Sequence, residues 1–273
     1  MLVKLALPAL GPLTIAALRY SLGGLLLLPF MKRPFHTLRN LSPGMWGQLL
    51  LLGLWSNAIG NGLLYVALRW LPATTISVLL NMVPSAVLLG ALLWLKEIPT
   101  PLQVLGVVVG LLGGGVFFSS QRFAVHPLGL ALIVVSLACF AAFILLSRKI
   151  IRQQLVDTLT LTALPLLLGG VVLLPISVVA EGLPSFSPYA WSIVLFMAAV
   201  NSALAYMLYN HALKALSALE LSTIINLAPV ATALIAWPLL GELLDTIQIA
   251  GMLVAIAGVT LVVRGGRPER VPA

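Results

Sequence analysis

Charged residues are scarce in this chain of 273 residues. They make up 8% of the sequence, only seven of them are acidic, and 61% of the residues are hydrophobic. The mean hydropathy is +1.13. An average soluble domain carries about 25% charged residues, so this chain lacks the polar surface that a soluble fold needs. The composition instead predicts an all-α polytopic membrane protein.

Cysteine and the common catalytic motifs are also missing. Because Cys139 is the single cysteine, no disulfide can form within the chain. The sequence contains no H-E-x-x-H, no phosphate-binding G-x-x-x-x-G-K-[ST] and no G-x-S-x-G, and its three histidines lie far apart. We therefore expect no enzymatic activity, no metal site and no cofactor.

Long apolar runs are present instead, and clusters of glycine, proline and charged residues separate them. Each run is close to the ~20 residues that an α-helix needs to cross about 30 Å of hydrocarbon. We predict nine membrane spans, at residues 12–31, 44–68, 74–95, 101–119, 127–147, 157–180, 189–213, 218–240 and 245–263.

The basic residues predict the orientation. If the chain starts outside, eleven lysines and arginines fall on the cytoplasmic side, three fall outside, and Arg19 lies within a span. This distribution follows the positive-inside rule. It predicts a cytoplasmic (inner) membrane protein with a cytoplasmic C-terminus, and it accounts for the net charge of +8 without a nucleic-acid partner. The residues assigned to the cytoplasmic side are Lys32, Arg33, Arg39, Lys96, Arg148, Lys149, Arg152, Lys214, Arg264, Arg267 and Arg270.

The sequence contains an internal duplication with an offset of 145 residues. The stretch ISVLLNMVPSAVLLGALLWLKE at 76–97 returns as LSTIINLAPVATALIAWPLLGE at 221–242. The two copies are the third and eighth predicted spans, so they cross the membrane in opposite directions. An inverted repeat of this kind is typical of secondary transporters, whose substrate site lies near the midplane. The aligned pairs include Ser77/Ser222, Asn81/Asn226, Pro84/Pro229 and Glu97/Glu242.

The duplication predicts two repeats, at residues 1–122 and 123–273. The first repeat lacks one helix, because the partner of span 127–147 would lie upstream of Met1. Either the chain has lost the first helix of a ten-helix plan, or its start is assigned too far downstream. We favour the second explanation.

The repeated helix carries a polar interruption. Pro84 and Pro229 each remove a helical hydrogen bond to the carbonyl four residues earlier, next to the amides of Asn81 and Asn226. An unsatisfied backbone group in lipid costs several kcal/mol, so these groups must face protein, water or a ligand. The pair forms either two half-sites for a polar substrate, or two kinked helices whose amides bond to neighbouring helices.

A second polar feature, a stripe of side chains along one helical face, precedes the interrupted helix in each copy. Asn57, Asn61 and Tyr65 are spaced by four residues, which places them on one face of an α-helix. Ser202, Tyr206 and Asn210 repeat this spacing in the second copy. They would supply donors and aromatic faces to a cavity between the halves, or else hydrogen bonds between helices. The substrate-binding candidates are therefore Asn57, Asn61, Tyr65, Asn81, Ser202, Tyr206, Asn210 and Asn226.

Two ionisable residues are candidates for coupling or gating. Arg19 lies about two turns inside its span, so it must face a cavity or extend towards the surface. Glu220 lies near the cytoplasmic end of its span, where we expect a solvated position. The glycines at 106, 110 and 114 form a stripe that favours close helix packing.

With these features, the chain resembles the EamA-type carriers of the drug/metabolite transporter superfamily. The resemblance rests on the duplicated helices NMVPSAVLLGALLWLKE and NLAPVATALIAWPLLGE, the Gln-x-x-Gly helix after each, and Leu18-Arg19 in the first span. Lys96 stands where the family usually has glycine. The resemblance implies a ten-helix, five-plus-five inverted fold with a central cavity that opens to one side at a time.

The resemblance also implies a function. We expect a secondary carrier that moves a small polar or amphipathic metabolite across the bilayer, most often outwards, and the substrate itself cannot be transferred from the family. Two alternatives stay open: a non-transporting membrane scaffold or partner subunit, and a lipid-head-group flippase. The oligomeric state is not predicted.

Overall fold

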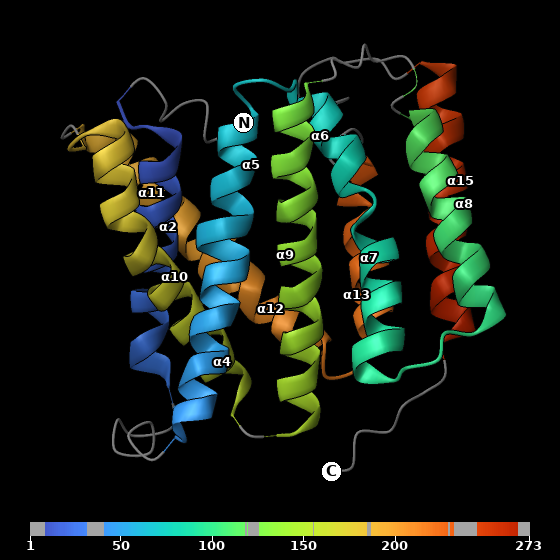
Figure 1. Cartoon of the computed structure of the whole chain (residues 1–273), viewed down its shortest axis with the longest axis horizontal. Helices are drawn as coiled ribbons and strands as arrows, with labels where there is room; N and C mark the ends of the chain where they lie inside the picture. The colour runs from blue at the N-terminus through green and yellow to red at the C-terminus, as the bar shows by residue number, and fades with distance from the viewer. Residues whose placement is uncertain are drawn as a thin grey trace. The chain divides into compact units, whose positions relative to one another are not determined.

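The computed structural model describes residues 9–31, 41–117, 119, 126–154, 156–184, 187–228, 230–231 and 245–266, and in these ranges it contains helices and no strand (Figure 1). The all-α multi-pass prediction is confirmed. Within the described ranges, seven helical segments are long and apolar enough to cross a membrane, and Pro101–Phe117 is a shorter apolar helix. The predicted span 218–240 is described only as far as residue 231, so the count of nine stays a prediction. Pro229 and Glu242 lie outside the described residues.

The chain divides into two compact units. Unit 1 comprises Met1–Val66 and Leu146–Lys214, and unit 2 comprises Ala67–Leu145 and Ala215–Ala273. Each unit therefore combines segments from both copies of the duplicated sequence. Two of the three boundaries fall inside helices, namely α5 (Gly62–Ala67) and α9 (Pro127–Arg152), and the third lies in the turn between Lys214 and Ala215.

Unit 1 is built on α2 and α10, which are equivalent helices of the two copies. Their backbones approach closely, because a β-carbon on Gly24 would lie 2.6 Å from the amide nitrogen of Leu167, and Gly170 faces Ser21 in the same way. Higher residue numbers in one helix meet lower numbers in the other, so the two helices are antiparallel, as an inverted repeat requires. The elements of unit 1 are α2 (Pro12–Leu27), α4 (Pro43–Gly53), η2 (Leu54–Asn61), α5, the end of α9, α10 (Thr158–Glu181), α11 (Pro188–Met197), η4 (Ala198–Leu204) and α12 (Ala205–Ala212).

A carboxylate ties the ends of these two helices together. Glu181, the last residue of α10, accepts hydrogen bonds from the backbone amides of Leu13 (2.9 Å) and Thr14 (2.8 Å) and from the Thr14 hydroxyl (2.8 Å). The first amides of a helix have no partner within the helix, and its N-terminus favours negative charge. Glu181 therefore acts as the cap of α2.

Unit 2 repeats this principle with α8 and α15, which lie side by side in Figure 1. A β-carbon on Gly106 would lie 2.7 Å from the carbonyl oxygen of Gly258, and one on Gly113 would lie 2.9 Å from that of Gly251. These pairs are related by the offset of the duplication, so the contact is symmetric and antiparallel. The elements of unit 2 are α6 (Ala73–Leu80), α7 (Val83–Gly90), η3 (Ala91–Leu95), α8 (Pro101–Phe117), most of α9, α13 (Ala218–Ile225) and α15 (Thr246–Gly265).

The predicted span 127–147, which left Arg148 outside the helix, ends too early. Helix α9 continues to Arg152, and Arg148 is only 1% exposed. Its Nη1 donates a hydrogen bond of 2.5 Å to the carbonyl of Leu213, the residue that caps the C-terminal end of α12. The last carbonyls of a helix lack helical donors, and a cation at that end is favourable. The buried bond therefore lets an arginine lie within the helix, past the predicted end of the span.

Candidate functional site

The polar interruption in unit 2 is a break between two helices. Helix α6 ends at Leu80, Asn81 is its C-cap, and α7 begins at Val83 with Pro84 in its first turn. Proline fits this position, because an amide there would have no helical acceptor. Helix α13 ends at Ile225 with Asn226 as its C-cap, which matches Asn81 in the other copy. The two copies of the sequence therefore break at equivalent residues.

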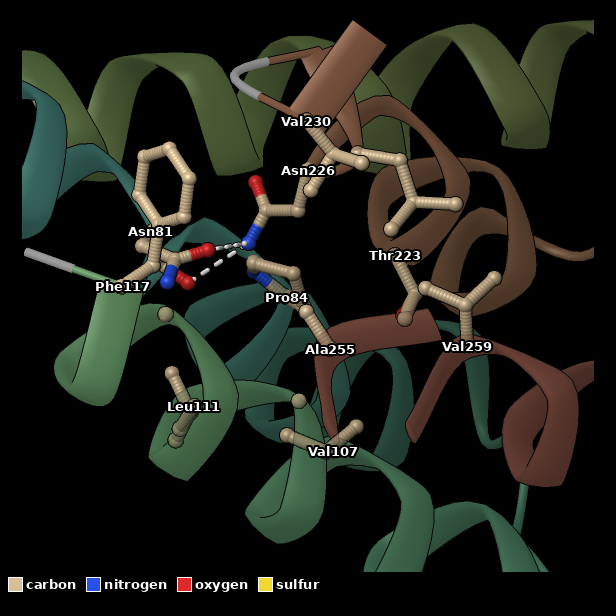
Figure 2. A pocket seen from close by; sticks show the side chains of 13 residues that line it. Asn81, Pro84, Val107, Leu111, Phe117, Thr223, Asn226, Val230, Ala255 and Val259 are labelled. Atoms are coloured by element: carbon tan, nitrogen blue, oxygen red, sulfur yellow. Dashed lines mark hydrogen bonds between the residues drawn. The ribbon is translucent and has the colours of Figure 1, made fainter. Parts of the chain in front are cut away.

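The amides at the two breaks contact each other. Asn226 Nδ2 donates to the carbonyl oxygen of Asn81 at 2.7 Å and to its Oδ1 at 2.6 Å, as the dashed lines in Figure 2 show. The amide of Asn81 also lies directly against the backbone of α8 at Gly114. The interpretation that these amides bond between helices is therefore realised in this conformation.

A small cavity lies beside this pair. It is lined by both asparagines, Thr223, Gly110, Phe117 and several apolar side chains (Figure 2). The volume open to the centre of a water-sized sphere is about 30 Å³. Since one water needs about 10–15 Å³ on this measure, the cavity has room for about two waters. It is too small for a metabolite in this conformation.

The contact between Gly114 and Asn81 gives a first prediction. Gly114→Ala would place a methyl group on the Asn81 amide, which Asn226 holds in place. We expect the free energy of unfolding to fall by about 1–2 kcal/mol, which corresponds to a decrease of roughly 3–6 °C in the melting temperature. The measurement is thermal unfolding of the detergent-solubilised protein. The control is Gly115→Ala, because a β-carbon there meets nothing within 4 Å. A Gly114→Ala variant as stable as this control would contradict the contact.

Unit 1 holds the second polar stripe on π-helical segments. The segments η2 and η4 occupy equivalent positions in the two copies. A π-helix is rare and occurs frequently at functional sites. Within η2, Asn61 donates through Nδ2 to the carbonyl of Ser56, five residues earlier, at 2.6 Å. Asn57 and Asn61 therefore have different hydrogen-bond partners in this conformation.

Asn57 lies where α10 and the α4–η2 segment cross. A β-carbon on Gly53 would lie 2.8 Å from the amide nitrogen of Gly169, so the two backbones nearly touch. This approach brings Asn57 Nδ2 within 3.2 Å of the carbonyl of Pro165, to which it donates. Asn57 Oδ1 accepts a hydrogen bond from the hydroxyl of Tyr206 at 3.4 Å. The same hydroxyl lies 3.1 Å from Ser56 Oγ.

Aromatic rings connect this network to Arg19. The rings of Tyr206 and Tyr20 meet edge to face, with centroids 6.4 Å apart and an interplanar angle of 77°. Arg19 Nη2 donates to the Tyr20 hydroxyl at 2.5 Å, and Tyr65 packs against the same core. We call Arg19, Tyr20, Tyr65 and Tyr206 the Arg19 cluster.

Two other candidates of unit 1 lie at helix contacts. Ser202 is fully buried, and its β-carbon would lie 2.9 Å from a β-carbon on Gly23. Asn210 Nδ2 donates to the hydroxyl of Thr162 on α10 at 3.0 Å. Both positions pack helices together in this conformation.

The expectation of a solvated Glu220 is wrong. Glu220 is 8% exposed and forms a capping box at the start of α13. It accepts from the backbone amide of Ser217 at 2.8 Å, while the Ser217 hydroxyl accepts from the amide of Glu220 at 3.2 Å. The end of α15 at Gly266 covers the remaining carboxylate oxygen. Capping satisfies this carboxylate and allows its burial.

The structure thus brings the candidates together in two groups. Asn57, Tyr65 and Tyr206 join Arg19 in unit 1, while Asn61 bonds within its own helix. Asn81 and Asn226 meet in unit 2. The sequence interpretation missed Tyr20, whose one signal was its position beside Arg19, and the role of Gly114. Among the described residues, no group of three or more His, Cys, Asp or Glu side chains could hold a metal ion.

Comparisons with known proteins agree with this architecture. A family model described as "EamA-like transporter family" matches residues 1–119 and 127–264. The chain is 28% identical over 271 residues to an "Uncharacterized transporter" of Archaeoglobus fulgidus, which covers 95% of this chain and 90% of that protein. It is 27% identical over 269 residues to the "Uncharacterized inner membrane transporter YedA" of Escherichia coli, with 96% and 85% covered.

Two further likenesses were found. The chain is 26% identical over 258 residues to "Protein PecM" of Dickeya dadantii, covering 94% of this chain and 84% of that protein. One solved crystal structure aligns with a TM-score of 0.74 and 18% identity, covering 95% of this chain and 90% of that chain. The second likeness concerns the fold alone.

Proposed function

The chain belongs to the EamA-like transporter family, and from this premise we propose that it is a secondary carrier that exports a small polar or amphipathic metabolite by alternating access. As a member of the family, it is a multi-pass membrane transporter. The proposal adds the export direction and the class of substrate. It also retains the repeats 1–122 and 123–273 from the sequence duplication. From the distribution of basic residues it retains the inner-membrane location and the cytoplasmic C-terminus.

One observation carries the proposal: helices of both copies break at equivalent residues, Asn81 and Asn226, and the amides at the breaks bond to each other beside a cavity. Discontinuous helices at the meeting of inverted repeats are where secondary carriers bind their substrates. Backbone irregularity inside a bilayer persists only where protein, water or a ligand satisfies it. The cavity of this conformation is small, so substrate entry requires these two breaks to separate.

The polar network of unit 1 supports the same proposal. Asn57 and Tyr206 are polar side chains inside apolar spans, and each is held by hydrogen bonds to another helix. Such groups in membrane helices face the interior of a bundle or an aqueous cavity. Asn57 and Asn81 are therefore the residues at which we expect substitutions to lower transport.

The test is metabolite export from cells that express the chain, profiled against cells that do not. For any metabolite whose export depends on the chain, Asn57→Ala and Asn81→Ala should lower the export rate per molecule of transporter roughly tenfold or more, because each removes hydrogen bonds at the site. The abundance of both variants in the membrane should stay near that of the wild type. Ser147→Ala is the matched control, because its buried hydroxyl has no hydrogen-bond partner among the described residues. Equal losses of export and abundance in the asparagine variants would reject the site, and an unchanged export profile would reject the carrier.

A further inference from the structure

The Arg19 side chain is charged and lies inside the membrane span Pro12–Phe30. It is seven residues beyond the first residue of α2, which corresponds to roughly 10 Å along the helix axis. A guanidinium stays protonated under all ordinary conditions. Within a span such a charge is costly, and it is normally paired with an acid or with backbone carbonyls.

The described residues leave much of this guanidinium unpaired. Its one hydrogen bond there runs from Nη2 to the Tyr20 hydroxyl, and its central carbon lies 4.6 Å from the centroid of the Tyr20 ring. The Nε atom is buried and has no hydrogen-bond partner. Since an arginine presents five N–H donors in a planar fork, most of its donor capacity remains available.

No carboxylate of unit 1 compensates the charge. The sequence of this unit contains two acidic residues, Asp157 and Glu181, and both cap helix N-termini. Asp157 accepts from the amide and the hydroxyl of Thr160, and Glu181 accepts from the first turn of α2. The groups close enough to act on Arg19 electrostatically are Tyr20, Tyr65 and Tyr206. These described neighbours are all neutral phenols.

The charge also occurs only once in the duplication. The residue equivalent to Arg19 in the second copy is Leu164, which is buried in α10. The duplicated asparagines therefore present the same chemistry twice, whereas the Arg19 cluster presents one cation. A single cation with free donors suits a single anionic group.

We propose that Arg19, oriented by Tyr20 and flanked by Tyr65 and Tyr206, binds the carboxylate of the transported metabolite. A guanidinium fork pairs with a carboxylate through two parallel hydrogen bonds. The faces and edges of the tyrosine rings offer an apolar contact with a polar tip, which suits the organic part of the same molecule. This assignment rests on the proposed carrier function, and it narrows the substrate to organic acids and amino acids.

The test is thermal unfolding of the purified full chain in an uncharged detergent. Matched probes with and without the charge are succinate and succinamide, benzoate and benzamide, and leucine and leucinamide. At saturating concentration at least one carboxylate should raise the melting temperature by about 5 °C or more, and its amide partner should not. Arg19→Gln should abolish this rise. The control Arg69→Gln, which removes an exposed positive charge of unit 2, should preserve it.

The second readout needs no ligand. If the partner of Arg19 is an external anion, the ligand-free Arg19→Gln variant should melt at the same temperature as the ligand-free wild type or at a higher one. The reason is that the variant no longer buries an unpaired charge. A variant that melts several degrees lower, or fails to accumulate, would show that the fold itself depends on the charge and would overturn the proposal.

Three other results would also overturn it. These are equal stabilisation of wild type and Arg19→Gln by the carboxylates, equal stabilisation by the amides, and no stabilisation by any probe. Stabilisation by added phosphatidylglycerol alone belongs to the last case and identifies a lipid headgroup as the counter-ion. The outcome is separable from the carrier function: binding without export would reject the carrier and keep the anion site, and export without Arg19-dependent binding would do the reverse.

Discussion

Replacing Gly113 by leucine is expected to prevent the protein from accumulating in the membrane. A β-carbon at this position would lie 2.7 Å from the Cα atom of Ala255 and 2.9 Å from the carbonyl oxygen of Gly251. Both atoms belong to the backbone of α15, so no side-chain rotation can make room. The two helices would have to separate along their length. The decrease in the free energy of unfolding should exceed the 1–3 kcal/mol that is typical of overpacked cores.

The measurement is the amount of full-length protein in the membrane fraction, followed by thermal unfolding of whatever is recovered. Gly115→Leu is the matched control two residues further along α8, because a β-carbon on Gly115 meets nothing within 4 Å. It should accumulate like the wild type. Equal accumulation of the two variants would mean that the close crossing of α8 and α15 is not needed for the fold.

Replacing Arg148 by methionine should cause the second largest decrease in stability. The side chain is 1% exposed and donates to the carbonyl of Leu213, at the C-terminal end of α12. Without it, a buried carbonyl loses its charged donor, which costs about 2–3 kcal/mol. We expect the melting temperature to fall by roughly 5–10 °C.

Arg148→Lys should lie between methionine and the wild type, since lysine keeps the charge but lacks the planar fork. The control is Arg152→Met, which removes an exposed arginine one helical turn further along α9. It should have little effect. If Arg148→Met and Arg152→Met melt at the same temperature, the bond to Leu213 contributes nothing measurable.

Local features of the sequence predicted most of the fold. The apolar runs indicated membrane helices because their length and composition are local properties. The breaks at Asn81 and Asn226 were also predictable, since an amide close before a proline marks the same position in both copies. That the two amides touch was not predictable, because they are 145 residues apart in the sequence and their contact depends on tertiary packing, including that of α8 against Asn81 at Gly114.

The errors came from partners that are distant in sequence. Arg148 was left outside the span 127–147 because its acceptor, Leu213, lies 65 residues away. Glu220 was expected in solvent because Gly266, which covers it, comes from the end of another helix.

The π-helical turn of η2 affects the whole span Pro43–Ala67. A turn that holds about one extra residue puts the stretches before and after it out of phase by roughly 100°. The face of α4 that packs against α10 is therefore not in line with the corresponding face of α5. One membrane helix can pack closely on α10 over its first half and contribute Tyr65 to the Arg19 cluster over its second half, within one continuous span.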